Sequence, residues 1–205
     1  MMKFSRALLA GLLLAAFSLT SYAVTFTPAQ ITTIKAAIAA DPVLAGAAAN
    51  SDGSAAIAAA FDVVDQTFFV WQSATPTANI LDAITLANLT PADTPDATVT
   101  YTNRSLICQI KQMNLQLLLQ GRDSVSSGKA NVRAALQDAL INIPSGTAGA
   151  LVGAGWTGVK TAMERNATRL EKLLATGTGT AAAPAALGFE GIVLWPDIDA
   201  VRNAP

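Results

Sequence analysis

Apolar and polar positions past residue 23 follow helical spacing over most of the chain. The first helix is well specified, because Thr27 can cap it, Pro28 suits its first position and Gln30 completes a capping box. One apolar face then runs along the helix through Ile31, Ile34 and Ile38. Asp41 and Pro42 are expected to end it.

Further helices are predicted over residues 54–61, 103–120, 130–143 and 148–175, with a short closing helix that begins near Pro196. The helix over 103–120 has the widest apolar surface. Its main stripe consists of Leu106, Ile110, Met113 and Leu117, and the residues that widen it are Ile107, Leu115 and Leu118. A helix that is apolar around so much of its circumference is expected to run through the middle of the fold.

Two segments are rich in aromatic and β-branched residues and are therefore strand candidates. They are "DQTFFVWQS" at 65–73 and "LGFEGIVLW" at 187–195, and we expect them to pair as a small two-stranded antiparallel sheet. The predicted fold class is mostly α (α+β), with about five to six helices in one domain over 24–205.

Residues 72–101 form the least regular part of the pattern. Pro76, Pro91 and Pro95 interrupt it, and only "NILDAITLANL" is briefly helical. We predict an irregular excursion that either carries binding or assembly contacts or is disordered.

Residues 1–23 have the parts of a secretory signal in the usual order. Lys3 and Arg6 come first, an apolar run follows over 7–19, and Ser21 and Ala23 supply small residues before a cleavage point. The apolar run is short for a permanent membrane anchor. This leader-like segment predicts export to the periplasm or beyond, with no membrane association after its removal.

Composition excludes most catalytic chemistry. The chain has no histidine, so the commonest general base and metal ligand are missing. Cys108 is the only cysteine, which rules out an intrachain disulfide and a thiolate metal cluster; its apolar neighbours predict a buried structural thiol. We therefore expect no catalytic residues, no cofactor, no metal and no small-molecule substrate, so that the protein is not an enzyme.

Charge is distributed unevenly along the chain. Residues 24–103 contain one Lys and seven Asp, whereas residues 104–205 contain ten Lys and Arg against seven Asp and Glu. Neither half has a basic run dense enough for nucleic-acid binding, so no sequence-specific nucleic-acid partner is expected.

The segment "GAGWTG" at 153–158 matches the glycine spacing of dinucleotide sites, but no suitable strand and βαβ unit surround it. It also fails as a phosphate loop, because Val159 separates Gly158 from Lys160. The glycines then indicate close packing or flexibility at the start of a helix. Trp156, the one bulky residue of this turn, is a candidate subunit contact.

From residue 24 onward the chain resembles a family of poorly characterised tailed-bacteriophage proteins associated with the virion structural genes. The segments that carry the resemblance are "TFTPAQITTIKAAIAADPVL", "SDGSAAIAAAF", "FFVW", "NVRAALQDAL", "NATRLEKLLATGTGT" and "EGIVLWPDIDAVRNA". They span most of residues 25–204, and 72–101 matches least.

The resemblance implies a small non-enzymatic structural or assembly protein of the virion, near the head–tail junction, with other virion proteins and further copies of itself as partners. It brings no established functional residues. Arg169, Glu171 and Lys172 lie on the segment that matches best, and we take them as candidate subunit contacts on the polar face of a helix.

The leader conflicts with this implied role, because virion proteins assemble in the host cytoplasm. One alternative is an exported periplasmic or surface helical binding protein built on the same domain. The other is a true start at Val24, since a GTG start codon is written as valine inside a longer reading frame.

Overall fold

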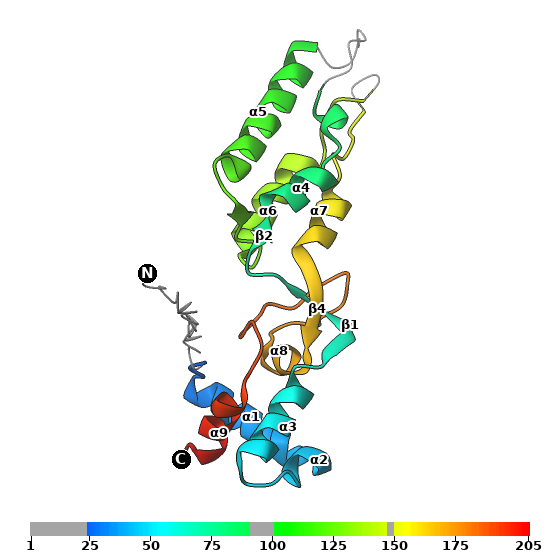
Figure 1. Cartoon of the computed structure of the whole chain (residues 1–205). Coiled ribbons are helices and arrows are strands. Elements are labelled where there is room, and N and C mark those ends of the chain that lie inside the picture. Colours follow the sequence, from blue (N-terminus) through cyan, green and yellow to red (C-terminus); the bar gives the residue numbers. More distant parts are fainter. Residues whose placement is uncertain (1–23, 91–100, 147–149) are drawn as a thin grey trace, which may run out of the picture.

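The computed structural model of the chain describes residues 24–90, 101–146 and 150–205; the leader-like segment 1–23 lies outside the described residues. The described part is mostly helical, with nine α-helices, a main two-stranded antiparallel sheet and a second, two-residue strand pair, which confirms the predicted fold class. The molecule is elongated, with a group of helices at each end and the sheet between them (Figure 1).

The helices at one end, which we call the terminal module, come from both ends of the described chain. They are α1 (Pro28–Ala40), α2 (Pro42–Ala45), α3 (Ser51–Phe61), α8 (Arg169–Leu174) and α9 (Trp195–Asn203). The predicted capping box between Thr27 and Gln30 is present at the start of α1. Ile34, Ile57 and Ile198 are fully buried in the shared core of this module.

The other end, which we call the insertion module, is formed by the chain between the two main strands. Its helices are α4 (Thr77–Ala83), the 3-10 helix η1 (Leu86–Leu89), α5 (Tyr101–Leu119), α6 (Ala130–Leu140) and α7 (Trp156–Met163). Two short strands, β2 (Thr75–Pro76) and β3 (Ser124–Val125), pair beside α4. A separate core with Ile80, Leu136 and Met163 at its centre holds these helices together, and Cys108 is buried in it as predicted.

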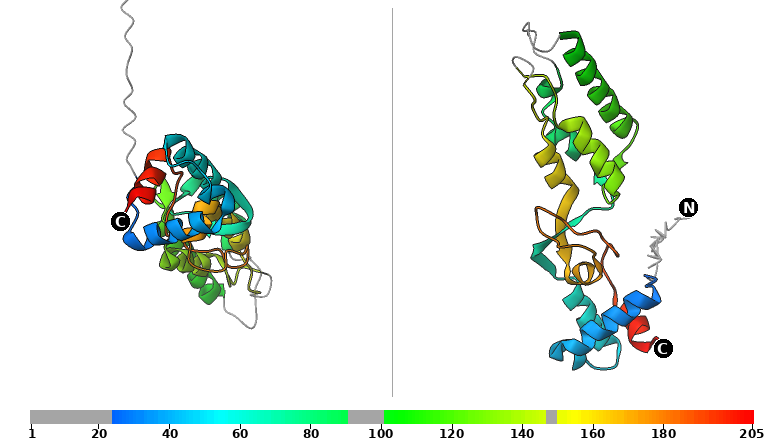
Figure 2. Two further views of the ribbon diagram at one scale, coloured as in Figure 1. Left: turned by 90° about the horizontal axis from the view of Figure 1, so that it is seen from below. Right: turned by 180° about the vertical axis from the view of Figure 1, so that it is seen from behind.

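Strands β1 (Val64–Trp71) and β4 (Glu164–Thr168) pair antiparallel between the two modules. The chain enters the insertion module after β1 and returns through β4, as Figure 2 shows from behind. The first strand is the one predicted at 65–73. A small third core, formed by Val70, Ala167 and Ala185, lies at this sheet.

The predicted second strand at 187–195 is wrong, because β4 pairs with β1 instead. Gly191 has a φ of +123°, a backbone conformation that interrupts an extended strand. The apolar residues of this segment fill the terminal core: Phe189 lies 5.4 Å from the Phe26 ring, and Val193 is buried.

The single helix predicted over 148–175 is also wrong. The chain forms α7, leaves the helical conformation for β4, and begins α8 at Arg169. Thr168 caps α8 through a capping box with Glu171. A threonine three residues before a glutamate is a sequence signature of a helix start, and it marks the position of this break.

Helix α5 does not run through the middle of the fold, as its pattern had predicted. It lies along the outer side of the insertion module (Figures 1 and 2). Cys108, Leu115 and Leu119 face the module's core, whereas the predicted main stripe is exposed.

Within the predicted irregular excursion at 72–101, residues 75–89 form β2, α4 and η1. These elements include the briefly helical stretch expected at 79–89. Residues 91–100 lie outside the described residues.

Candidate functional site

The start of α8 brings together most of the charged residues that the sequence had singled out. Thr168 Oγ1 accepts a hydrogen bond from the Glu171 amide at 3.2 Å, and the Glu171 carboxylate accepts one from the Thr168 amide at 2.8 Å. This reciprocal pair fixes the first turn of α8. It points Glu171 into the molecule, while Arg169 and Lys172 remain partly exposed.

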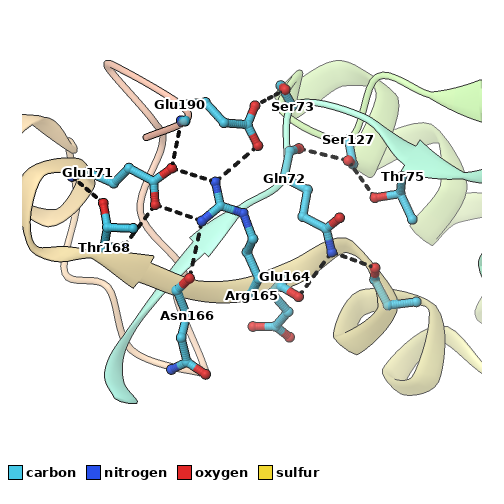
Figure 3. Close-up of polar contacts among 12 residues, drawn as sticks. Gln72, Ser73, Thr75, Ser127, Glu164, Arg165, Asn166, Thr168, Glu171 and Glu190 are labelled. Atoms are coloured by element: carbon cyan, nitrogen blue, oxygen red, sulfur yellow. Dashed lines mark hydrogen bonds and ion pairs between the residues drawn. The ribbon is translucent and has the colours of Figure 1, made fainter. Parts of the chain in front are cut away.

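Glu171 is 1 % exposed and is held by Arg165 of β4. Both terminal nitrogens of Arg165 donate to the carboxylate, each at 2.7 Å (Figure 3). Gly191 donates a third contact through its amide at 3.1 Å. The structure therefore places Glu171 inside the chain and not on the polar helix face where the pattern had put it.

The electrostatics of this pair follow from its geometry. Burial by itself would raise the pKa of Glu171, but the hydrogen bonds from Arg165, Thr168 and Gly191 outweigh it and lower the pKa. The hydrogen bonds to Glu171 raise the pKa of Arg165 above its usual range. Both groups are therefore charged at neutral pH.

The ion pair belongs to a polar network that links the sheet to both modules (Figure 3). Glu190 accepts one further hydrogen bond from Arg165 at 3.1 Å and also contacts Ser73. Gln72, at the end of β1, donates to the carbonyl oxygens of Ala162 and Glu164 and accepts from the Ser127 hydroxyl. The network fixes the path of the chain where it enters and leaves the insertion module.

Arg169 and Lys172 each form an ion pair at the surface of the terminal module. Arg169 donates to Asp41 at 2.8 Å, and Lys172 donates to Asp65 at 2.6 Å. The hydrogen bond from Arg169 lowers the pKa of Asp41, and the bond from Lys172, followed by those from Thr67, lowers the pKa of Asp65. Each cation is thus positioned by a carboxylate on a different element.

A surface groove of about 650 Å³ lies between these two ion pairs. Its lining residues come from α1, α3, α8 and the start of β1: Ala37, Phe61, Val63, Val64, Asp65, Arg169, Lys172 and Leu173. Val63 is 60 % exposed although it is apolar. An apolar floor with paired charges at its edge is the arrangement typical of a protein-binding surface, with a dry centre and a polar rim.

Trp156 lies at a different place, about the start of α7. It is partly buried and packs against the insertion core, so part of its ring remains at the surface, and its role as a subunit contact stays a prediction. It lines a second groove of about 480 Å³ with Trp71, Arg133 and Lys160. The Arg133 guanidinium lies 4.3 Å from the centre of the Trp71 ring, a cation–π contact that fixes both side chains.

The glycine motif at 153–158 has a packing role, and close packing was one of the two explanations expected from the sequence. Gly155 has a φ of +90°, and a Cβ there would lie 2.2 Å from the carbonyl oxygen of Ala83. In the described residues directly before the motif, 150–152, Val152 forms an isolated bridge with Ile143 and no strand of the kind that a dinucleotide site needs.

Among the described residues, no group of three or more acidic or cysteine side chains could hold a metal ion. Over the same ranges, none of the helices combines the length and apolar character needed to cross a membrane.

Sequence reasoning missed three participants of the site, namely Arg165, Asp41 and Asp65. Each contacts an α8 residue, but Asp41 and Asp65 are more than 100 positions away from their partners in the chain. The one local signal of this site was the capping-box spacing from Thr168 to Glu171. This spacing predicts that the Glu171 side chain folds back onto the start of the helix.

No family model matches this chain, and no curated protein or solved structure is significantly similar to it.

Proposed function

We propose that this protein is a non-enzymatic structural or assembly protein of a tailed-phage virion, positioned near the head–tail junction, and that the groove beside α8 contacts a neighbouring virion subunit. One observation carries the proposal. Three of the segments on which the phage resemblance rests, at 25–44, 51–61 and 166–180, all line this groove. They are distant in sequence and contribute to one surface.

The chemistry of the groove supports a docking role. Arg169 and Lys172 are held by carboxylates and are oriented before any partner arrives, which reduces the entropy lost on binding. The exposed Val63 and Val64 offer apolar area between them.

A second candidate function is an exported periplasmic or surface helical binding protein. The observation that favours it is the signal-like order of charged, apolar and small residues over 1–23. The same groove would then bind a protein or peptide outside the cytoplasm.

Location separates the two candidates. The proposal expects the protein in purified phage particles from the strain that carries the gene, detected by mass spectrometry, and a GTG at codon 24 preceded by a ribosome-binding site. Enrichment in a periplasmic extract, with none in particles, would overturn the virion role in favour of export.

The groove is tested by charge reversal. Arg169→Glu places a second negative charge beside Asp41 and is expected to reduce the yield of infectious particles at least tenfold. Arg122→Glu, at an exposed arginine of the insertion module, is the matched control and is expected to leave the yield unchanged. Equal yields from the two variants would remove the groove from the proposed contact.

A further inference from the structure

Helix α5 has a long apolar stripe that faces away from the rest of the described chain. Leu106, Ile110, Met113 and Leu117 are 54 %, 43 %, 55 % and 67 % exposed, and Ile107 beside them is 42 % exposed. Soluble monomers rarely expose a continuous apolar patch of more than a few hundred Å². These five neighbouring side chains reach about that size, so the stripe requires an explanation.

The stripe has the spacing of a coiled-coil seam. Its four main residues are separated by four, three and four positions, which is the a/d pattern of two heptads. The opposite side of the helix, with Cys108, Leu115 and Leu119, is already used by the insertion core. Helix α5 therefore has two apolar faces, and within the described part of the chain only one of them is covered.

Polar groups beside the stripe are compatible with a second copy of the same helix. Gln109, Asn114 and Gln116 are exposed and uncharged, and each amide can both donate and accept a hydrogen bond. The charged residues of α5 lie elsewhere: Arg104 is buried and Lys111 reaches Asp138 of α6. Two identical faces can thus meet without like-charge repulsion, whereas a membrane surface would favour basic residues beside the stripe.

We infer that this face of α5 is the contact between two copies of the chain, related by a two-fold axis. Because α5 is already packed on α6, it does not have to fold when the copies associate, which removes the usual cost for so short a seam. The stripes and the flanking amides of both copies together bury on the order of 1,000 Å², near the lower limit for a specific interface. A dissociation constant in the micromolar range is therefore expected.

The test uses the full chain at concentrations from about 2 to 200 μM, with molar mass measured by light scattering and sedimentation. The wild-type chain is expected to change from one chain mass to two over this range. The double variant Ile110→Asp/Leu117→Asp is expected to raise the dissociation constant at least tenfold. Val43→Asp, on α2 at an equally apolar and more exposed position, is the control and should dimerise like the wild type.

A second measurement avoids dependence on how well the aspartate variants fold. Ile110→Cys is expected to give a covalent dimer with a short bifunctional maleimide, and Val43→Cys is not. A wild-type chain that stays at one chain mass at the highest concentration would overturn the inference and leave the stripe to another protein. Cross-linking that is no greater at position 110 than at position 43 would overturn it as well. The inference does not rest on the proposed virion role, since it is measured on the purified chain.

Discussion

Arg165 and Glu171 face each other in a two-pronged ion pair, with both nitrogen–oxygen distances at 2.7 Å. The pair joins the start of β4 to the first turn of α8, across the point where the chain changes from strand to helix. Glu171 is almost completely buried, so its charge depends on this partner. The pair thus fixes the start of α8, the helix that carries the two surface cations Arg169 and Lys172.

Removing the charge of Glu171 should destabilise the fold. Glu171→Gln replaces one carboxylate oxygen with an amide NH₂ donor, which would lie among the N–H groups of Arg165, Thr168 and Gly191. The variant is expected to lower the free energy of unfolding by about 3 kcal/mol, as for other broken buried pairs. Urea denaturation measures the change. Glu190→Gln is the control, because Glu190 is one-third exposed and meets Arg165 through a single contact at 3.1 Å. Its expected cost is below about 1 kcal/mol, and equal costs for the two variants would contradict the assigned importance of Glu171.

The same carboxylate should make stability depend on pH. Its pKa is lower in the folded chain than the value of about 4.3 of an unfolded glutamate, so its contribution is complete above that value and is lost as the pH falls through the folded pKa. The difference in unfolding free energy between wild type and Glu171→Gln is therefore expected to be constant from pH 8 to about 5.5 and to shrink below about pH 4.5. Glu164, whose pKa burial raises, is common to both proteins and cancels in this difference. Asp62 does not cancel completely, because the charge of Glu171 is one of the causes that raise its pKa. A difference that does not change down to pH 3 would be inconsistent with the lowered pKa.

Gly155 is predicted to be intolerant of any side chain. Gly155→Ala combines a left-handed backbone with a clash against Ala83, and we expect it to cost more than about 2 kcal/mol of unfolding free energy. Gly121 is a matched control, because its φ is +69° but nothing lies within 4 Å of its Cβ position. Gly121→Ala should cost only about 1 kcal/mol. Thermal and urea denaturation of both variants would show whether the clash or the backbone conformation dominates.

The two main cores should respond separately to mutation. Leu136→Ala in the insertion core is expected to cost about 3 kcal/mol and to accelerate hydrogen exchange in α6 and α7, with little change in α3 and α9. Ile57→Ala in the terminal core is the reciprocal variant and should show the opposite distribution. Uniform acceleration across both modules in either variant would indicate that they unfold as one unit.

Local signals in the sequence predicted many of the elements. The capped start at Thr27, the strand rich in aromatic residues at 65–73 and the helix over 103–120 each depend on neighbours a few positions apart. The spacing of apolar residues and the capping residues were sufficient to predict the fold class. It also placed Arg169 and Lys172 on a helix with partly exposed side chains.

Contacts between distant residues decided the rest. Composition favoured 187–195 as the second strand, but pairing depends on which segment returns beside β1 after the insertion module, and that segment is the polar Glu164–Thr168. An apolar stripe does not say what covers it, so α5 could not be assigned to an outer position from its pattern alone. The sequence by itself determined where helices α1, α5 and α6 lie and which residues are apolar. Only the tertiary structure decided that Glu171 is buried and the α5 stripe exposed, because burial depends on partners brought together by the whole chain.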